Sequence, residues 1–93
     1  MDFDALSERF LGEPGVAEGQ MFGMPILKAG GKVFAGSWNG ELVVKLPRGR
    51  VQALIDDGEG APFEPMAGRA MKEWVIVRDD GLAQEALDFV RGS

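Results

Sequence analysis

The sequence contains no cysteine and no histidine among its 93 residues. Without cysteine the chain can form no disulfide, thiolate nucleophile or thiolate metal site, and without histidine it lacks the commonest general base and transition-metal ligand. An enzyme would have to use carboxylates, lysines or serines alone, and no pair of these is placed convincingly for catalysis. We therefore expect a protein with no enzymatic activity, no bound metal and no cofactor.

Long hydrophobic runs are absent as well. Stretches such as residues 42–44 fall far short of the roughly 20 residues that a bilayer span requires. The amino terminus carries acidic residues instead of the basic region of a secretory signal peptide. These features predict a cytoplasmic protein with no membrane partner, and the chain length predicts a single domain over residues 1–93.

Basic residues are few and unevenly distributed. The formal net charge of −5 disfavours nucleic-acid binding, because phosphate recognition requires a basic surface. Residues 21–50, however, contain only one acidic residue, Glu41, and form a basic island of Lys28, Lys32, Lys45, Arg48 and Arg50. Our second hypothesis for function is that this island binds an anion or a nucleic acid. The side chains expected to contact the bound anion are Lys32, Lys45, Arg50, Arg69 and Lys72.

Three segments have the periodicity of amphipathic helices. Residues 2–11 gather their apolar side chains on one face, and residues 50–57 form a second helix that Gly58 would end. A third helix would follow Asp79 or Asp80. We interpret these aspartates as helix caps and not as metal ligands.

The remaining segments predict an antiparallel sheet. Residues 16–46 alternate between apolar and polar side chains, which predicts a meander of three or four strands, and residues 71–77 predict a further strand. Residues 59–68 predict an ordered excursion anchored by Phe63 and Met66. The fold class is therefore α+β, in the order helix, three or four strands, helix, one or two strands, helix.

The pair Asn39-Gly40 gives the strongest local signal. Both residue types tolerate the positive φ of a type I′ turn, so a two-residue hairpin is expected here, with Trp38 opposite Glu41. Such a turn divides the flanking strands into two faces, because side chains alternate. One face would form the core: Val33, Ala35, Leu42, Val44 and Leu46. The other would bind a partner protein or a second copy of the chain: Phe34, Gly36, Trp38, Val43 and Lys45.

Two residues of this predicted interaction face have alternative interpretations. A glycine inside a strand, here Gly36, marks either the close approach of another backbone or ligand, or a β-bulge. Lys45 is either a solvent-exposed strand residue or an anion contact.

Four short motifs occur in a characteristic order: Met21-Phe22-Gly23, Gly31-Lys32-Val33-Phe34-Ala35, Leu42-Val43-Val44-Lys45-Leu46, and Phe63-x-Pro65-x-x-Gly68-Arg69-x-Met71-Lys72-Glu73-Trp74-Val75. Over residues 15–77 the chain thereby resembles the TfoX amino-terminal domain family, found in bacterial competence regulators and as a free-standing small protein. The resemblance implies a strongly bent antiparallel sheet flanked by helices, like that of type III secretion chaperones, and no enzyme activity.

The resemblance also implies a role in protein interaction and regulation. Full-length competence regulators carry a second, carboxyl-terminal domain, for which 93 residues leave no room. We therefore do not expect the competence role itself to apply, and the first hypothesis for function is a regulatory interaction domain.

Overall fold

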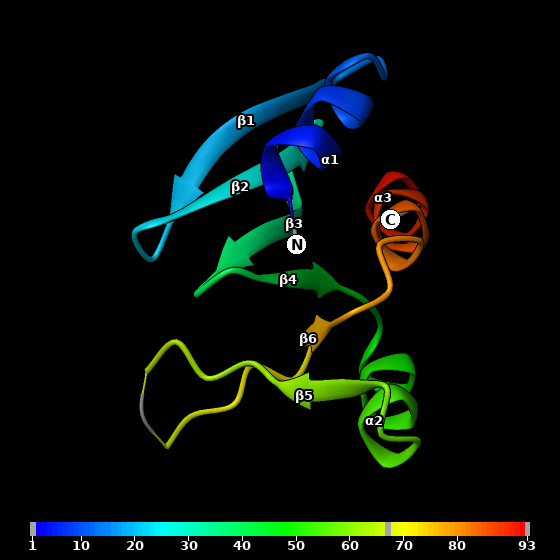
Figure 1. The fold of residues 1–93 in the computed structure, drawn as a ribbon. Coiled ribbons are helices and arrows are strands. Elements are labelled where there is room, and N and C mark those ends of the chain that lie inside the picture. The colour runs from blue at the N-terminus through cyan, green and yellow to red at the C-terminus, as the bar shows by residue number, and fades with distance from the viewer. Residues whose placement is uncertain (1, 67, 93) are drawn as a thin grey trace.

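The computed structural model describes residues 2–66 and 68–92 and confirms an α+β domain (Figure 1). In these ranges the helices are α1 (Phe3–Leu11), α2 (Arg48–Asp56) and α3 (Leu82–Arg91). The strands are β1 (Val16–Met21), β2 (Met24–Ala29), β3 (Lys32–Trp38), β4 (Glu41–Lys45), β5 (Gly60–Pro62) and β6 (Trp74–Val77). They form one antiparallel sheet in the order β1-β2-β3-β4-β6-β5.

The three predicted helices are present, with ends set by local chemistry. Asp2 caps α1, because its carboxylate accepts the backbone N–H of Ala5 at 3.1 Å. Helix α2 begins two residues earlier than expected, directly after Pro47, and Gly58 follows it with a φ of 77°. Before α3, Asp79 accepts the N–H of Gly81 at 2.8 Å, but Gly81 itself occupies the cap position and α3 has no side-chain cap, so the predicted capping by Asp79 or Asp80 is wrong.

The helices contribute to a helix-side cluster on one face of the sheet (Figure 1). Its fully buried large side chains include Phe10, Phe34, Leu42, Val44 and Leu87. A smaller loop-side cluster lies on the opposite face and consists of Met24, Ile26, Val43, Phe63 and Trp74. The sheet is therefore covered on both faces, by helices on one and mainly by the segment that leads from β5 to β6 on the other.

The hairpin at Asn39-Gly40 is confirmed. These two residues have φ values of 51° and 79°, and Trp38 lies opposite Glu41 in the ladder between β3 and β4. The alternation predicted for β4 also holds, since Leu42 and Val44 enter the helix-side cluster whereas Val43 enters the loop-side cluster.

The predicted faces of Val33 and Phe34 are wrong. Strand β3 contains a β-bulge opposite β2. Leu27 pairs with Ala35 and the next residue, Lys28, pairs with Val33, so three residues of β3 lie opposite two of β2. Phe34 is the additional residue, and it joins Ala35 in the helix-side cluster, while Val33 packs against the loop-side cluster. The bulge thus exchanges the expected faces of these two side chains without changing the register of the hairpin.

The segment between α2 and β6 also differs from expectation. Phe63 is fully buried as predicted, but Met66 is 63% exposed and is not an anchor. The carbonyl of Met66 accepts the N–H of Arg69 at 3.1 Å, which closes a tight turn at the surface. Strand β5 lies within the stretch expected to be an excursion, and with β6 it gives the larger of the one or two strands expected between the second and third helices. Strand β6 begins at Trp74, later than expected.

Candidate functional site

Most of the predicted interaction face lies inside the protein. Phe34 and Val43 have no exposed surface and Gly36 is buried, so none of the three can offer a side chain to a partner. Trp38 and Lys45 are partly exposed. Sequence periodicity correctly separated two faces of β4, but it could not indicate that the segment before β6 folds over the second face.

Gly36 makes room for neighbouring side chains of the same protein. A Cβ atom at this position would lie 2.5 Å from Cε of Met24, 3.0 Å from Cγ2 of Ile26 and 3.2 Å from the carbonyl oxygen of Pro25. The close approach predicted for this glycine is therefore made by β2, and it explains the glycine without a ligand.

The turn between β1 and β2 contains an exposed aromatic residue in an unfavourable backbone conformation. Met21 pairs with Met24, and the two residues between them, Phe22 and Gly23, have φ values of 53° and 74°. Positive φ is rare for a bulky residue, because its Cβ crowds the following carbonyl. The Phe22 side chain is nevertheless 49% exposed.

Sequence reasoning missed this turn, since Phe-Gly is not a typical type I′ pair. The available signal was Gly23 between two alternating runs.

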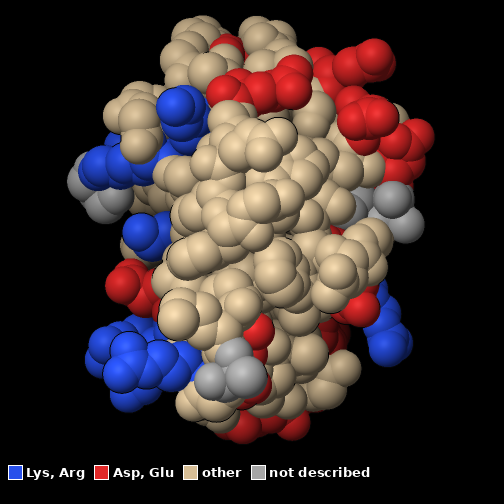
Figure 2. All heavy atoms as spheres, turned by 90° about the vertical axis from the view of Figure 1, so that its left-hand side faces the viewer, with Lys and Arg blue, Asp and Glu red and all other residues tan. Residues whose placement is uncertain are grey.

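Three protruding features lie on the same side of the sheet, on the left in Figure 1: the Phe22-Gly23 turn, the end of β3 at Trp38 and the loop that carries Met66. We use the name turn-tip surface for the exposed residues of these three features, Phe22, Trp38 and Met66. Trp38 is held by an edge-to-face contact with Phe63, with ring centroids 5.5 Å apart. The face on this side has a broad centre with few charged side chains. Basic side chains predominate along its left border, where an acidic one also lies, and acidic ones predominate at its top and upper right, while the lower right and the bottom carry further charges (Figure 2).

The predicted basic island does not form one continuous site. Arg50 donates two hydrogen bonds to Glu85, from Nε at 2.8 Å and from Nη2 at 3.2 Å, and so ties α2 to α3. This hydrogen bond, together with the charge of Glu85, raises the pKa of the Arg50 guanidinium. Arg50 is thus engaged within the protein, while Lys28 and Lys32 lie near the β2–β3 turn.

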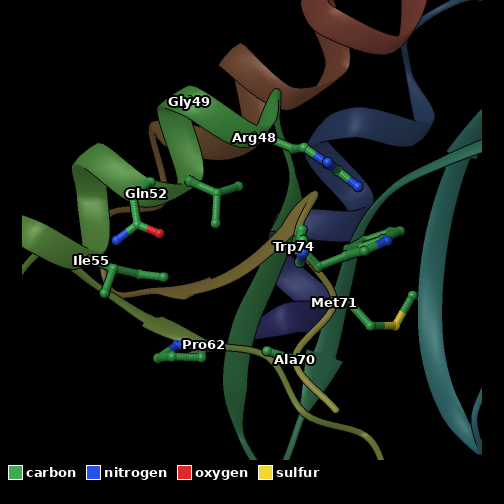
Figure 3. Close-up of a pocket in the computed structure, with 10 residues that line it drawn as sticks. Arg48, Gly49, Gln52, Ile55, Pro62, Ala70, Met71 and Trp74 are labelled. Carbon is green, nitrogen blue, oxygen red and sulfur yellow. The ribbon is translucent and has the colours of Figure 1, made fainter.

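Other predicted basic residues gather near a pocket beside α2 (Figure 3). The pocket has a volume of about 600 Å³ and lies between α2, Pro62 of β5 and residues 70–74. Arg48 and Lys72 contribute to its lining, and the ammonium of Lys45 lies 6.0 Å from the ring centre of Trp74, which forms one wall. Arg69 is exposed at the neighbouring turn and does not line this pocket.

The part of the chain that the structure describes has neither a cluster of metal-ligating side chains nor a membrane-spanning helix. No three Asp or Glu side chains within residues 2–66 and 68–92 come together as a metal-binding group. None of the helices in those ranges combines the length and the apolar character needed to span a membrane.

Comparison with protein families and with curated proteins finds no match for this chain.

Proposed function

We propose that this protein is a non-enzymatic interaction domain that associates with a second copy of itself through the turn-tip surface. The observation that carries the proposal is Phe22, an aromatic side chain 49% exposed at a φ of 53°. A residue in such a conformation costs the fold roughly 1–3 kcal/mol, and strain of this kind is concentrated at functional sites. Asparagine or glycine would form the same turn at less cost.

The surroundings of Phe22 favour a protein partner. Met66 is the most exposed large apolar side chain that the structure describes, at 63%, and Trp38 is partly exposed on the same side. Aromatic residues and methionine are enriched in protein interfaces, whereas charged residues are depleted from interface centres. The centre of the face in Figure 2 carries few charged side chains, as the centre of an interface does.

The distribution of charge around that centre favours a second copy as the partner. Basic side chains predominate along the left border of this face, and acidic side chains predominate at its top and upper right (Figure 2). A two-fold axis lying in the face can place the basic border of one copy against the acidic border of the other. A uniformly acidic or basic partner would match only one of these borders.

Sedimentation equilibrium over a range of protein concentrations tests the proposal. The wild-type protein should form a dimer, and Phe22→Asn should shift the equilibrium towards the monomer while keeping the turn. Leu11→Asn is the matched control, because Leu11 is also exposed but ends α1, away from the β1–β2 turn. A wild-type protein that stays monomeric at every concentration, or a Phe22→Asn variant that dimerises as tightly as wild type, would refute self-association.

A regulatory role like that implied by the resemblance to the TfoX amino-terminal domain family stays a prediction, as does a cytoplasmic location. A domain of this kind could exert a regulatory effect through the change between monomer and dimer, without catalysing a reaction. The test is to compare gene expression in the native cell with the wild-type protein and with Phe22→Asn. Equal profiles would contradict a regulatory role exerted through the turn-tip surface.

A further inference from the structure

The pocket beside α2 has a largely apolar wall. Val51 and Ile55 approach it from α2, Pro62 from β5, and Met71 and Trp74 from the facing segment. In Figure 3, Ile55 points into the space between α2 and this segment. An open pocket of about 600 Å³ is large enough for a small molecule, since ligand pockets typically measure roughly 300–1,000 Å³.

Two cationic side chains line the same pocket. The side chains of Arg48 and Lys72 form no ion pair or hydrogen bond with any residue in the ranges 2–66 and 68–92. Arg50 and Arg91, by contrast, pair with Glu85 and Glu13. The lining contains no aspartate or glutamate, although the sequence as a whole is acidic. Among the described residues, the pocket therefore presents two cationic side chains without a paired acid, next to apolar surface.

The backbone of α2 adds to this positive potential. Arg48 and Gly49 belong to the first turn of α2 and line the pocket, and Pro47 provides no side-chain acceptor for the N–H groups there. A helix amino terminus carries a partial positive charge and stabilises an anion nearby. Arg48 extends from this turn towards the wall formed by Trp74 (Figure 3).

We propose that this pocket binds a small apolar carboxylate, with the carboxylate held by Arg48 and Lys72 and the hydrocarbon part packed against Trp74 and Met71. Charge-assisted hydrogen bonds to arginine and lysine suit a carboxylate. A nucleic-acid backbone fits less well, because it requires an extended basic groove and would leave the apolar wall unused. This site is separate from the turn-tip surface, so either can fail without the other.

Titrations followed by amide and indole NMR test the proposal with three probes: octanoate, octanamide and acetate. Octanoate should shift the signals of Arg48, Gly49 and the Trp74 indole. Octanamide lacks the charge and should bind at least about tenfold more weakly, and acetate lacks the hydrocarbon chain and should bind too weakly to saturate. Equal affinity for octanoate and octanamide, or shifts confined to other residues, would overturn the proposal.

Substitutions provide an independent test. The double variant Arg48→Gln with Lys72→Gln should weaken octanoate binding about tenfold or more, because it removes both charged contacts. Arg50→Gln is the matched control, since Arg50 lies on the same helix but is paired with Glu85. All of these side chains are exposed, and the amide spectrum will confirm that each variant is folded. Equal losses in the double variant and in the control would contradict the proposed site.

The same carboxylate chemistry could come from a free acid or from the carboxyl end of a polypeptide. An acetylated tripeptide ending in leucine, with a free or an amidated terminus, distinguishes these sources. If only the free-terminus peptide binds, the natural ligand is a chain end, and if only octanoate binds, it is a free acid. Failure of both carboxylates to bind would refute the site.

Discussion

The rings of Phe10 and Phe34 meet edge to face, with their centroids 5.7 Å apart and their planes at 70°. This contact joins α1 to β3 inside the helix-side cluster. Phe34 reaches it because the bulge in β3 turns this residue towards the helices. The aromatic contact is therefore a consequence of one additional residue in one strand.

Phe34→Ala should lower the free energy of unfolding by about 3–5 kcal/mol, because it leaves a cavity in a closely packed core. The matched control is Phe22→Ala, the same change at an exposed position, which should cost no more than roughly 0.5 kcal/mol. Chemical denaturation of the three proteins measures both values. Similar losses for the two variants would contradict the burial of Phe34.

Val43→Ala and Val44→Ala should destabilise the protein by similar amounts, about 1–3 kcal/mol each. Both side chains are fully buried, one in each cluster. Lys45→Ala should change stability little, because Lys45 is partly exposed. Denaturant midpoints measure these effects, and a Val43→Ala variant as stable as wild type would show that the loop-side cluster is loosely packed.

Phe22→Asn should raise the free energy of unfolding of the monomer by about 1 kcal/mol, because asparagine tolerates positive φ better than phenylalanine does. Phe22→Ala separates conformation from side-chain loss, since alanine keeps the unfavourable φ. The measurement is thermal unfolding at a concentration where the wild-type protein is monomeric. If Phe22→Asn is no more stable than Phe22→Ala, the positive φ of residue 22 has no such cost and the prediction is wrong.

Gly36→Ala should destabilise the protein by roughly 1–3 kcal/mol through overpacking. The new Cβ would lie 2.5 Å from Cε of Met24, so this side chain would have to move. Adding Met24→Leu removes that atom and should restore part of the loss, which a double-mutant cycle measures. An additive result would point instead to the Pro25 carbonyl, which cannot move without the strand.

Removal of the Arg50–Glu85 ion pair should have only a small effect on stability, because both side chains are more than one third exposed. Since Glu85 raises the pKa of Arg50 above its ordinary value, the contribution is fully present below that ordinary value and is lost only as the pH rises through the raised pKa. The difference between wild type and Arg50→Gln should therefore be constant around neutral pH. It should shrink in about 1 M salt, and a difference that persists there would indicate a packing role.

Local sequence signals predicted much of the fold. Asn39-Gly40 predicted the hairpin and the alternation of side chains along β4 correctly. Both depend on only a few neighbouring residues, the first on turn conformation and the second on the two-residue period of a strand. The bulge at Phe34 had only an indirect signal, because Gly36, two residues later, could mark a bulge but did not say which residue would be the additional one. Its conformation is selected by packing against Phe10, a residue distant in the sequence.

The candidate sites depended even more on tertiary structure. Phe63, which follows β5, covers Val43 in the loop-side cluster. Arg50 of α2 is paired with Glu85 of α3. Neither relationship follows from the residues next to Val43 or Arg50. The predicted basic residues Lys45 and Lys72 do lie near one pocket. Their proximity depends on Trp74 and on the packing of α2 beside it, which the sequence around each lysine does not indicate.

The strand order also has a consequence for how the chain is made. Strand β4 pairs on one side with β3, its neighbour in sequence, and on the other with β6. During synthesis β4 therefore leaves the ribosome with one edge unpaired, and residues 46–73 must follow before β6 can join it. Its run Leu42-Val43-Val44 is apolar and uncharged, and an open edge of this kind can pair with another chain. The interval before β6 arrives is thus the stage at which a nascent chain is most exposed to aggregation.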